Sequence, residues 1–282
     1  MNTGFGNLTA ISLAKEGYPV IATCLLPDSV KELESLDIPN LTPIKMDVTS
    51  QQDIDSVFDY VQEKHASLYG LINNAGINHG FYLELTNIDH YTNTFNVNYF
   101  GVVRCCKTFL PLLRKTKNAR IINISTQGIF MPVPGSSSYC SSKSAMKTFS
   151  DCLRMELLHT GVSVTVITPG VYATPLLDRR KHAEEIFDSL TQEQRATFGE
   201  DQIEHYRGFF NKGPRAAAKP ENCVKQIVKV STAKRPPMER LIGYDSYLFW
   251  YFYYILPTFV KVLIFRVVWF ILFLVIGKNK RK

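Results

Sequence analysis

The sequence predicts an α/β fold in which a doubly wound parallel sheet has helices packed on both of its faces. Short runs rich in Val, Ile and Thr alternate with longer amphipathic stretches over most of the chain, which is the pattern of repeated β–α–β units. The 282 residues, of which 45% are hydrophobic and 20% charged, also suit one large globular domain with a sizeable core. This domain is expected over residues 1–245, and an apolar segment with a basic tail, residues 246–282, follows it.

The expected strands and helices can be placed in order along the domain. The chain opens on the end of a glycine-rich turn, residues 2–7, which leads into a helix over residues 7–16 without a strand before it. Glycines in such a turn let the backbone approach a pyrophosphate, whose charge the helix N-terminus stabilises. The expected strands are residues 19–24, 41–46, 69–72, 120–126, 161–169 and 240–243. The further expected helices are residues 29–36, 51–64, 93–113 and 139–160.

The first strand of the sheet is expected to be missing. In the doubly wound order 3-2-1-4-5-6 this strand is central, so its loss leaves backbone groups of both neighbouring strands without partners. The sheet could also close up by pairing residues 19–24 directly with residues 69–72. We therefore expect the chain as given to bind a dinucleotide poorly, and Met1 to be an incomplete or alternative start.

Charge and cysteine content exclude several classes of function. The net charge is +7, but four of the last five residues are Lys or Arg, and no basic stripe with exposed aromatic residues stands out elsewhere. Nucleic acid is therefore not expected as a partner. The six cysteines have neither a CxxC spacing nor the density of a disulfide scaffold, so we expect reduced thiols and no metal site.

Tyr139 and Lys143 are the strongest catalytic candidates. Residues four apart on a helix share one face, and a neighbouring ammonium group favours the phenolate of a tyrosine, whose pKa is otherwise near ~10. The spacing alone favours an ordinary tyrosine and a solvated lysine. However, an expected strand ends in Ser125 and Thr126, fourteen and thirteen residues upstream of Tyr139, and either hydroxyl could orient a substrate.

Further binding candidates lie where the expected strands end. Asp47 could accept a hydrogen bond from an adenine amino group, or it could belong to the N-terminal turn of the next helix. The small residues of Asn73-Asn74-Ala75-Gly76 would let a flat ligand lie close to the backbone, although a plain turn is equally expected. Asn98 falls within an expected helix, where a buried Asn is unfavourable unless it is paired or useful.

Residues 178–212 are expected to form either a substrate lid or a helix pair that covers the sheet. This segment is helical and mixed in polarity. Its apolar anchors are Phe187, Leu190, Phe198, Tyr206, Phe209 and Phe210.

The C-terminal segment is expected to associate with a membrane. A transmembrane helix needs ~20 apolar residues, and residues 258–277 have that length but include Lys261 and Arg266. We therefore favour shallow or hairpin insertion over a full span, with the basic tail facing cytoplasmic lipid. The alternative is a helical flap over the substrate pocket.

The chain resembles the short-chain dehydrogenase/reductase family from about residue 3 to about residue 245. The residues that carry the resemblance are Asn73-Asn74-Ala75-Gly76, Asn98, the pair Tyr139-x-x-x-Lys143, and Pro169-Gly170, which stand in that family's order and approximate spacing. More local sequences look like the branch that contains retinol dehydrogenases and 17β-hydroxysteroid dehydrogenases. These are Gly4-Phe5-Gly6-Asn7, Tyr139-Cys140, Phe149-Ser150-Asp151 and Gly199-Glu200-Asp201.

This resemblance implies a Rossmann-like fold and hydride transfer between a lipophilic alcohol or ketone and NAD or NADP, with NAD favoured. It implies that Tyr139 takes the hydroxyl proton during oxidation, that Lys143 lowers the pKa of Tyr139 and bonds the nicotinamide ribose, and that Asn98 holds a water. The family places a serine twelve or thirteen residues before the tyrosine, so Thr126 is favoured over Ser125. The residues implied to contact the cofactor are Gly4, Phe5, Gly6, Asp47, Val48, Asn74, Ala75, Gly76, Tyr139, Lys143, Pro169, Gly170 and Thr174.

The resemblance further implies a retinol- or hydroxysteroid-like substrate, a location on the endoplasmic reticulum membrane, and a homodimer as one oligomeric form. The alternative to an enzyme is a catalytically silent relative that acts as a membrane-tethered binding or interaction protein. We favour the enzyme, because a binding module would have no chemical reason to keep Tyr139, Lys143 and Asn98 together.

Overall fold

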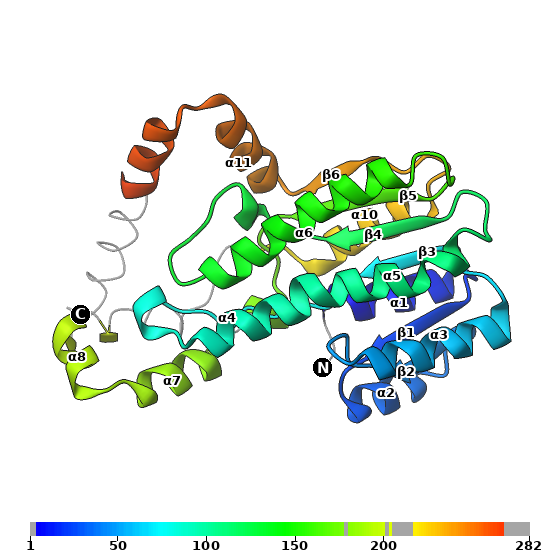
Figure 1. Cartoon of the computed structure of the whole chain (residues 1–282), viewed down its shortest axis with the longest axis horizontal. Helices are drawn as coiled ribbons and strands as arrows, with labels where there is room; N and C mark the ends of the chain where they lie inside the picture. The colour runs from blue at the N-terminus through cyan, green and yellow to red at the C-terminus, as the bar shows by residue number, and fades with distance from the viewer. Residues whose placement is uncertain (1–3, 178–179, 201–202, 205–216, 268–282) are drawn as a thin grey trace.

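The computed structural model describes residues 4–177, 180–200, 203–204 and 217–267, and within them the parallel strands form two sheets (Figure 1). One sheet pairs β1 (Val20–Cys24) with β2 (Leu41–Lys45). The other holds, in this order, β3 (Gly70–Asn73), β4 (Arg120–Ile124), β5 (Ser163–Pro169) and β6 (Glu239–Ile242). Each strand lies where the sequence predicts one, so the parallel α/β fold is confirmed.

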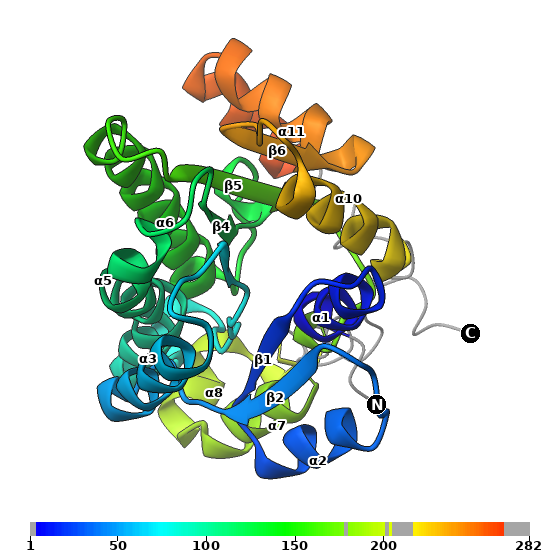
Figure 2. The same cartoon turned by 90° about the vertical axis from the view of Figure 1, so that its right-hand side faces the viewer.

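The two sheets are separate because β1 does not pair with β3. Among the described residues no strand lies between them, and Figure 2 shows the β1–β2 pair apart from β4, β5 and β6. The facing edges of β1 and β3 are therefore left without a neighbouring strand, as the sequence predicts for a sheet that lacks its central strand. The alternative in which β1 closes directly onto β3 is wrong.

Helices cover both faces of the sheets, as predicted (Figure 2). On one face, α3 (Gln51–His65), α5 (Gly101–Leu113) and α6 (Ser137–Glu156) bury apolar side chains against β3, β4 and β5. On the other face, α1 (Phe5–Lys15) packs on α10 (Pro220–Thr232) through Leu13, Val224 and Val228. The short helix α2 (Pro27–Glu34) buries Leu33 beside β1.

The glycine-rich turn is shorter than the sequence predicts. Helix α1 already begins at Phe5, so Phe5, Gly6 and Asn7 are helical and Gly4 is the residue that precedes the first turn. No side chain caps this helix N-terminus, so its first backbone N–H groups are left for a ligand or water.

The described part of the segment expected to be a lid or a helix pair over the sheet packs against residues 81–85. Helices α7 (Arg180–Ser189) and α8 (Gln192–Phe198) lie against the short turn Leu83–Leu85, and the rings of Phe187 and Phe81 meet edge to face with centroids 5.1 Å apart. Of the predicted anchors, Phe187 and Leu190 are buried and Phe198 packs against them. Tyr206, Phe209 and Phe210 lie outside the described residues.

The C-terminal segment extends beyond β6 as α11 (Tyr244–Ile255) and a second helix over residues 258–267 (Figure 1). Most of its large apolar side chains are exposed, and Tyr251, Phe259 and Leu263 are each more than half exposed. Within the ranges that the structure describes, we find no helix whose length and apolar character would suffice to cross a membrane. The rest of the predicted 258–277 stretch lies outside those ranges.

Candidate active site

Tyr139 and Lys143 lie in the first turns of α6, and both side chains are buried, with exposed fractions of 8% and 3%. The amino group of Lys143 donates a hydrogen bond of 2.8 Å to the carbonyl oxygen of Ile124, at the end of β4. The alternative of a solvated surface lysine is therefore wrong. A buried amine and a buried phenol on one helix face are costly to keep in a core, which favours a functional reason for them.

Burial shifts the pKa values of both groups toward their neutral forms. Burial raises the pKa of Tyr139 to about 12, while a hydrogen bond with the side chain of Thr126 lowers it. Burial lowers the pKa of Lys143 to about 8. The contribution predicted for Lys143 is not among the causes that set the pKa of Tyr139, and the Lys143 amine is instead bonded to the Ile124 carbonyl. At neutral pH the phenol is therefore protonated.

The two hydroxyls after β4 have different surroundings. Ser125 is 4% exposed, and its oxygen has no hydrogen-bond partner among the described residues. Thr126 caps the short turn Gln127–Ile129 by accepting a hydrogen bond of 3.2 Å from the Gly128 N–H, and its side chain also lowers the pKa of Tyr139. Only Thr126 therefore couples directly to the phenol.

Asn98 lies in a widened turn of the helix that the sequence predicts as continuous. Helix α4 (Ile88–Phe95) passes through a π-helical turn (Asn96–Phe100) into α5, so the predicted uninterrupted α-helix is wrong at this point. The Asn98 side chain is fully buried; it accepts from the Ile77 N–H at 2.8 Å, and it donates to the Ile77 carbonyl at 2.9 Å and to Ser142 at 3.0 Å. Single π-helical turns often occur at functional sites.

Two glycines bring the first turn of α1 and the end of β3 close to the buried lysine. A Cβ atom at Gly6 would come within 2.5 Å of the Asn74 amide nitrogen. A Cβ atom at Gly76 would lie 3.3 Å from Asn98 Oδ1 and 3.4 Å from Lys143 Nζ. The structure therefore places Gly6, Asn74, Gly76, Asn98 and Lys143 in one continuous region at the carboxyl end of β3.

The residues at the end of β5 contact α1 through Tyr172, which is not among the predicted site residues. Pro169 ends the strand, and the N–H of Gly170 donates to the Ile242 carbonyl at 2.8 Å. Tyr172 meets Phe5 edge to face, with ring centroids 5.6 Å apart. Thr174 begins the short turn Pro175–Leu177 and accepts from the Leu177 N–H through its carbonyl.

Asp47 and Val48 lie beyond β2 and make local contacts. One Asp47 carboxylate oxygen accepts from both the N–H and the hydroxyl of Thr49 at 2.8 Å, just before Ser50 caps α3. Asp47 lies three residues before Ser50, the N-cap of α3, so both alternatives for Asp47 stay predictions. Val48 packs on Gly101, where a Cβ atom would come within 2.9 Å of its side chain.

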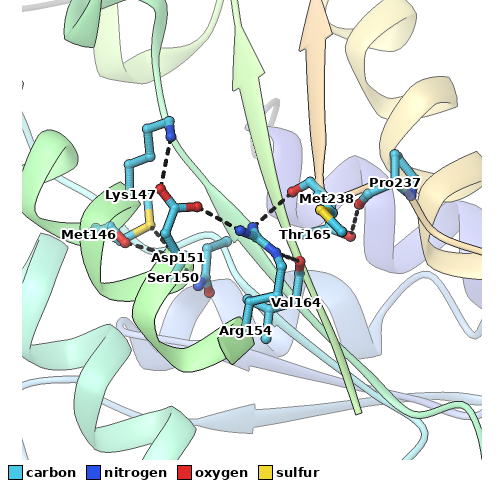
Figure 3. A network of polar contacts seen from close by, with 10 residues as sticks. Met146, Lys147, Ser150, Asp151, Arg154, Val164, Thr165, Pro237 and Met238 are labelled. Carbon is cyan, nitrogen blue, oxygen red and sulfur yellow. Dashed lines mark hydrogen bonds and ion pairs between the residues drawn. The ribbon is translucent and has the colours of Figure 1, made fainter. Parts of the chain in front are cut away.

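The rest of α6 is held on the sheet by the network in Figure 3. Asp151 bonds Lys147 at 3.0 Å and Arg154 at 2.7 Å. The Arg154 guanidinium also donates to the carbonyls of Val164 and Met238, each at 3.0 Å, which links α6 to β5 and to the residue before β6. These bonds fix the direction of the helix that carries Tyr139 and Lys143.

Sequence reasoning missed a second, buried connection between α6 and the sheet. Asn73 donates to Asn123 at 2.8 Å, and Asn123 donates to Ser150 at 2.8 Å. An Asn between isoleucines in Arg120-Ile121-Ile122-Asn123-Ile124 is a signal that could have revealed it, since a buried amide needs partners. Ser142, the partner of Asn98, had no comparable signal.

Comparison with known proteins identifies the family. A family model described as short chain dehydrogenase matches residues 1–185. The chain belongs to the short-chain dehydrogenase family. It is therefore an NAD(P)-dependent alcohol dehydrogenase or reductase, and the predicted resemblance is confirmed.

Relatives with related activities are similar over most of the chain. The rat mitochondrial D-beta-hydroxybutyrate dehydrogenase is 33% identical over 248 residues, which are 82% of this chain and 72% of the relative. The bovine 17-beta-hydroxysteroid dehydrogenase type 6 is 31% identical over 264 residues, which are 91% and 83% of the two chains. The human 11-beta-hydroxysteroid dehydrogenase type 2 is 32% identical over 266 residues, with 91% and 65% covered.

Solved structures share the fold at lower identity. A short-chain dehydrogenase from Streptomyces avermitilis has a TM-score of 0.71 and 23% identity over 88% of this chain and 87% of its own. A closed serine dehydrogenase complexed with NADP⁺ has a TM-score of 0.68 and 22% identity, with 85% of this chain and 90% of that chain covered.

The site residues fit a dinucleotide. The start of α1 beside Gly4 has no side-chain cap, Gly6 lies close to Asn74, and among the described residues the buried side-chain oxygens of Ser125 and Asn7 have no hydrogen-bond partner. When bound, the nicotinamide would accept or deliver a hydride. Gly4, Phe5, Gly6, Asn74, Ala75, Gly76 and Lys143 would hold the cofactor.

Proposed function

We propose that this dehydrogenase interconverts a lipophilic secondary alcohol, of the hydroxysteroid or retinol kind, and its carbonyl product, with NAD favoured over NADP. The observation that carries the proposal is that Tyr139 and Lys143 are both buried on α6, with the Thr126 side chain close enough to lower the pKa of Tyr139. The bovine and human hydroxysteroid dehydrogenases, similar over 91% of this chain, support a steroid-like substrate.

In this proposal Tyr139 transfers the proton, and Thr126, Lys143 and Asn98 position the reacting groups. Tyr139 is protonated at neutral pH, so it can donate a proton to the developing alkoxide during reduction, whereas in oxidation its phenolate form accepts the hydroxyl proton. Thr126 orients the phenol and the substrate oxygen. Lys143 holds the nicotinamide ribose and supplies positive charge, and Asn98 fixes the loop after β3 through Ile77. Fixed donors in a dry site stabilise a developing alkoxide.

A substrate and cofactor panel tests this proposal. NAD and NADP, each oxidised and reduced, would be assayed with hydroxysteroids, retinol, 3-hydroxybutyrate and their carbonyl products. We expect kcat/KM to be highest for a hydroxysteroid or retinol with the NAD pair. A higher kcat/KM for 3-hydroxybutyrate, the compound named for the rat relative, would contradict the lipophilic assignment.

Ser125 and Thr126 are expected to respond differently to substitution by Ala. Thr126→Ala removes the hydroxyl that bonds Tyr139, so we expect kcat to fall by about 10–100-fold, as for the loss of one hydrogen bond that strengthens in the transition state. Ser125→Ala removes a hydroxyl with no described partner and should have a smaller effect. Steady-state kinetics of both variants checks this. A larger loss for Ser125→Ala would assign the orienting role to Ser125 instead.

We further propose that residues 246–282 hold the protein on an anionic lipid surface, with the endoplasmic reticulum as the expected membrane. Exposed aromatic and aliphatic side chains on α11 and on residues 258–267 are typical of helices that lie in a membrane interface. The four basic residues at the C-terminus match anionic lipid. The rat relative is named as a mitochondrial enzyme, so the endoplasmic reticulum stays a prediction for this chain.

Truncation after Ser246 is expected to abolish binding to vesicles. The full chain and the truncated chain would be floated with phosphatidylcholine vesicles, with and without phosphatidylserine. We expect the full chain to float, more strongly with phosphatidylserine, and the truncated chain to remain in the dense fraction. Equal flotation of both chains would rule out this anchor.

A further inference from the structure

The start of α11 is clamped onto the end of β5 by two adjacent side chains. One carboxylate oxygen of Asp245 accepts from the Val171 N–H at 2.8 Å, and the other accepts from the Ser246 N–H at 3.0 Å. The Ser246 hydroxyl, which is fully buried, donates to the Thr168 carbonyl at 2.9 Å. Asp245 therefore bonds the loop after β5, whereas Ser246 bonds the strand itself.

Two glycines make room for the Asp245 carboxylate. A Cβ atom at Gly170 would overlap it, and one at Gly243 would come within 2.5 Å of it. Gly243 has a φ of +102°, a conformation that side chains with a Cβ rarely adopt, so the chain turns there at a glycine to present Asp245. Glycine is therefore required at both backbone positions that contact the carboxylate.

The loop that Asp245 bonds contacts the first turn of α1. Next to Val171, Tyr172 is buried, meets Phe5 of α1 and pairs with Ala218 in a β-bridge. At its far end α11 places Tyr253 and Tyr254 on Phe130, with ring centroids 5.8 and 6.1 Å apart, four residues after Thr126. Helix α11 therefore contacts both loops that flank the candidate site.

We propose that Asp245 is a positioning residue, which holds the loop from Gly170 to Thr174 in the conformation that receives the nicotinamide end of the cofactor. This inference rests on the proposed role of that loop in cofactor binding. Without the carboxylate, the Val171 N–H loses a charge-assisted acceptor, and the loop must be ordered by the cofactor itself. Binding is then weaker, although Asp245 does not act in the chemistry.

Three variants of the full chain test the proposal. Asp245→Ala removes the acceptor, Asp245→Asn keeps an acceptor oxygen without the charge, and Ser246→Ala is the matched control on the same helix turn. Titration with NAD⁺ and NADH would give Kd, and hydrogen–deuterium exchange of the ligand-free protein would report on residues 170–174. We expect Asp245→Ala to raise Kd about tenfold and to speed exchange in this loop.

The Asn variant is expected to bind within about threefold of the original chain, and Ser246→Ala within about twofold even if its melting temperature falls. Equal losses of affinity in Asp245→Ala and Ser246→Ala, or unchanged exchange of residues 170–174 in Asp245→Ala, would overturn the positioning role. Neither readout measures turnover. If Tyr139 proved not to be catalytic, the Kd and exchange results would therefore still test the role of Asp245. If the role of Asp245 were refuted, the assignment of Tyr139 would be unaffected.

Discussion

Replacement of Tyr139 by Phe is expected to lower turnover by about 10²–10⁴-fold, the usual contribution of one general acid or base. The variant keeps the ring, which is 8% exposed, and deletes only the hydroxyl that bonds Thr126. Cofactor affinity should therefore be nearly unchanged. Steady-state kinetics in both directions, with Kd for NAD⁺ and NADH by titration, measures the two effects separately.

Two further variants make this result specific. Lys143→Ala should lower both turnover and cofactor affinity, because Lys143 is proposed to bond the nicotinamide ribose and to supply positive charge. Tyr60→Phe, on α3, removes a phenol hydroxyl outside the candidate site and should leave both quantities unchanged. The oxidative rate of the original chain should rise with pH, since oxidation needs the phenolate and burial raises the pKa of Tyr139 to about 12. Normal turnover in Tyr139→Phe would remove it from the mechanism.

Addition of a strand that fits between β1 and β3 is expected to raise both the melting temperature and the cofactor-induced melting shift. The facing edges of β1 and β3 have no strand partner among the described residues. Each new backbone hydrogen bond contributes about 0.5–1.5 kcal/mol, so several of them are comparable with a total stability of ~5–15 kcal/mol. The turn after such a strand would also lead into α1 beside Gly4, where pyrophosphate is expected to bind.

The matched comparison uses three chains. One is the chain as given, the second carries an N-terminal apolar run followed by Thr-Gly and two or three linking residues, and the third replaces the apolar run by Gly and Ser of equal length. Scanning calorimetry with and without NAD⁺ measures the shifts. We expect a large gain only in the second chain. Equal and large shifts in the first and second chains would show that the gap between the sheets does not limit cofactor binding.

Much of the fold could be predicted because it is encoded in local patterns. The run Arg120-Ile121-Ile122-Asn123-Ile124 is β-branched and apolar enough to be a strand wherever it packs, and it is β4 in the structure. The four-residue spacing of Tyr139 and Lys143 places both on one face of any helix that contains them. Motif order along the chain then indicated the family, which the family model confirms.

The amino-acid sequence alone therefore determined the order of the strands, the helix that carries Tyr139 and Lys143, and the class of chemistry. Only the tertiary structure decided that β1 and β3 stay apart, that Lys143 is buried against Ile124, that the helix at Asn98 widens into a π turn, and that Asp245 is bonded to Val171. The physical reason is that each of these depends on a partner from another part of the chain. Periodicity reports which side of an element is apolar, but a buried polar group is satisfied by whichever distant donor or acceptor packing brings to it.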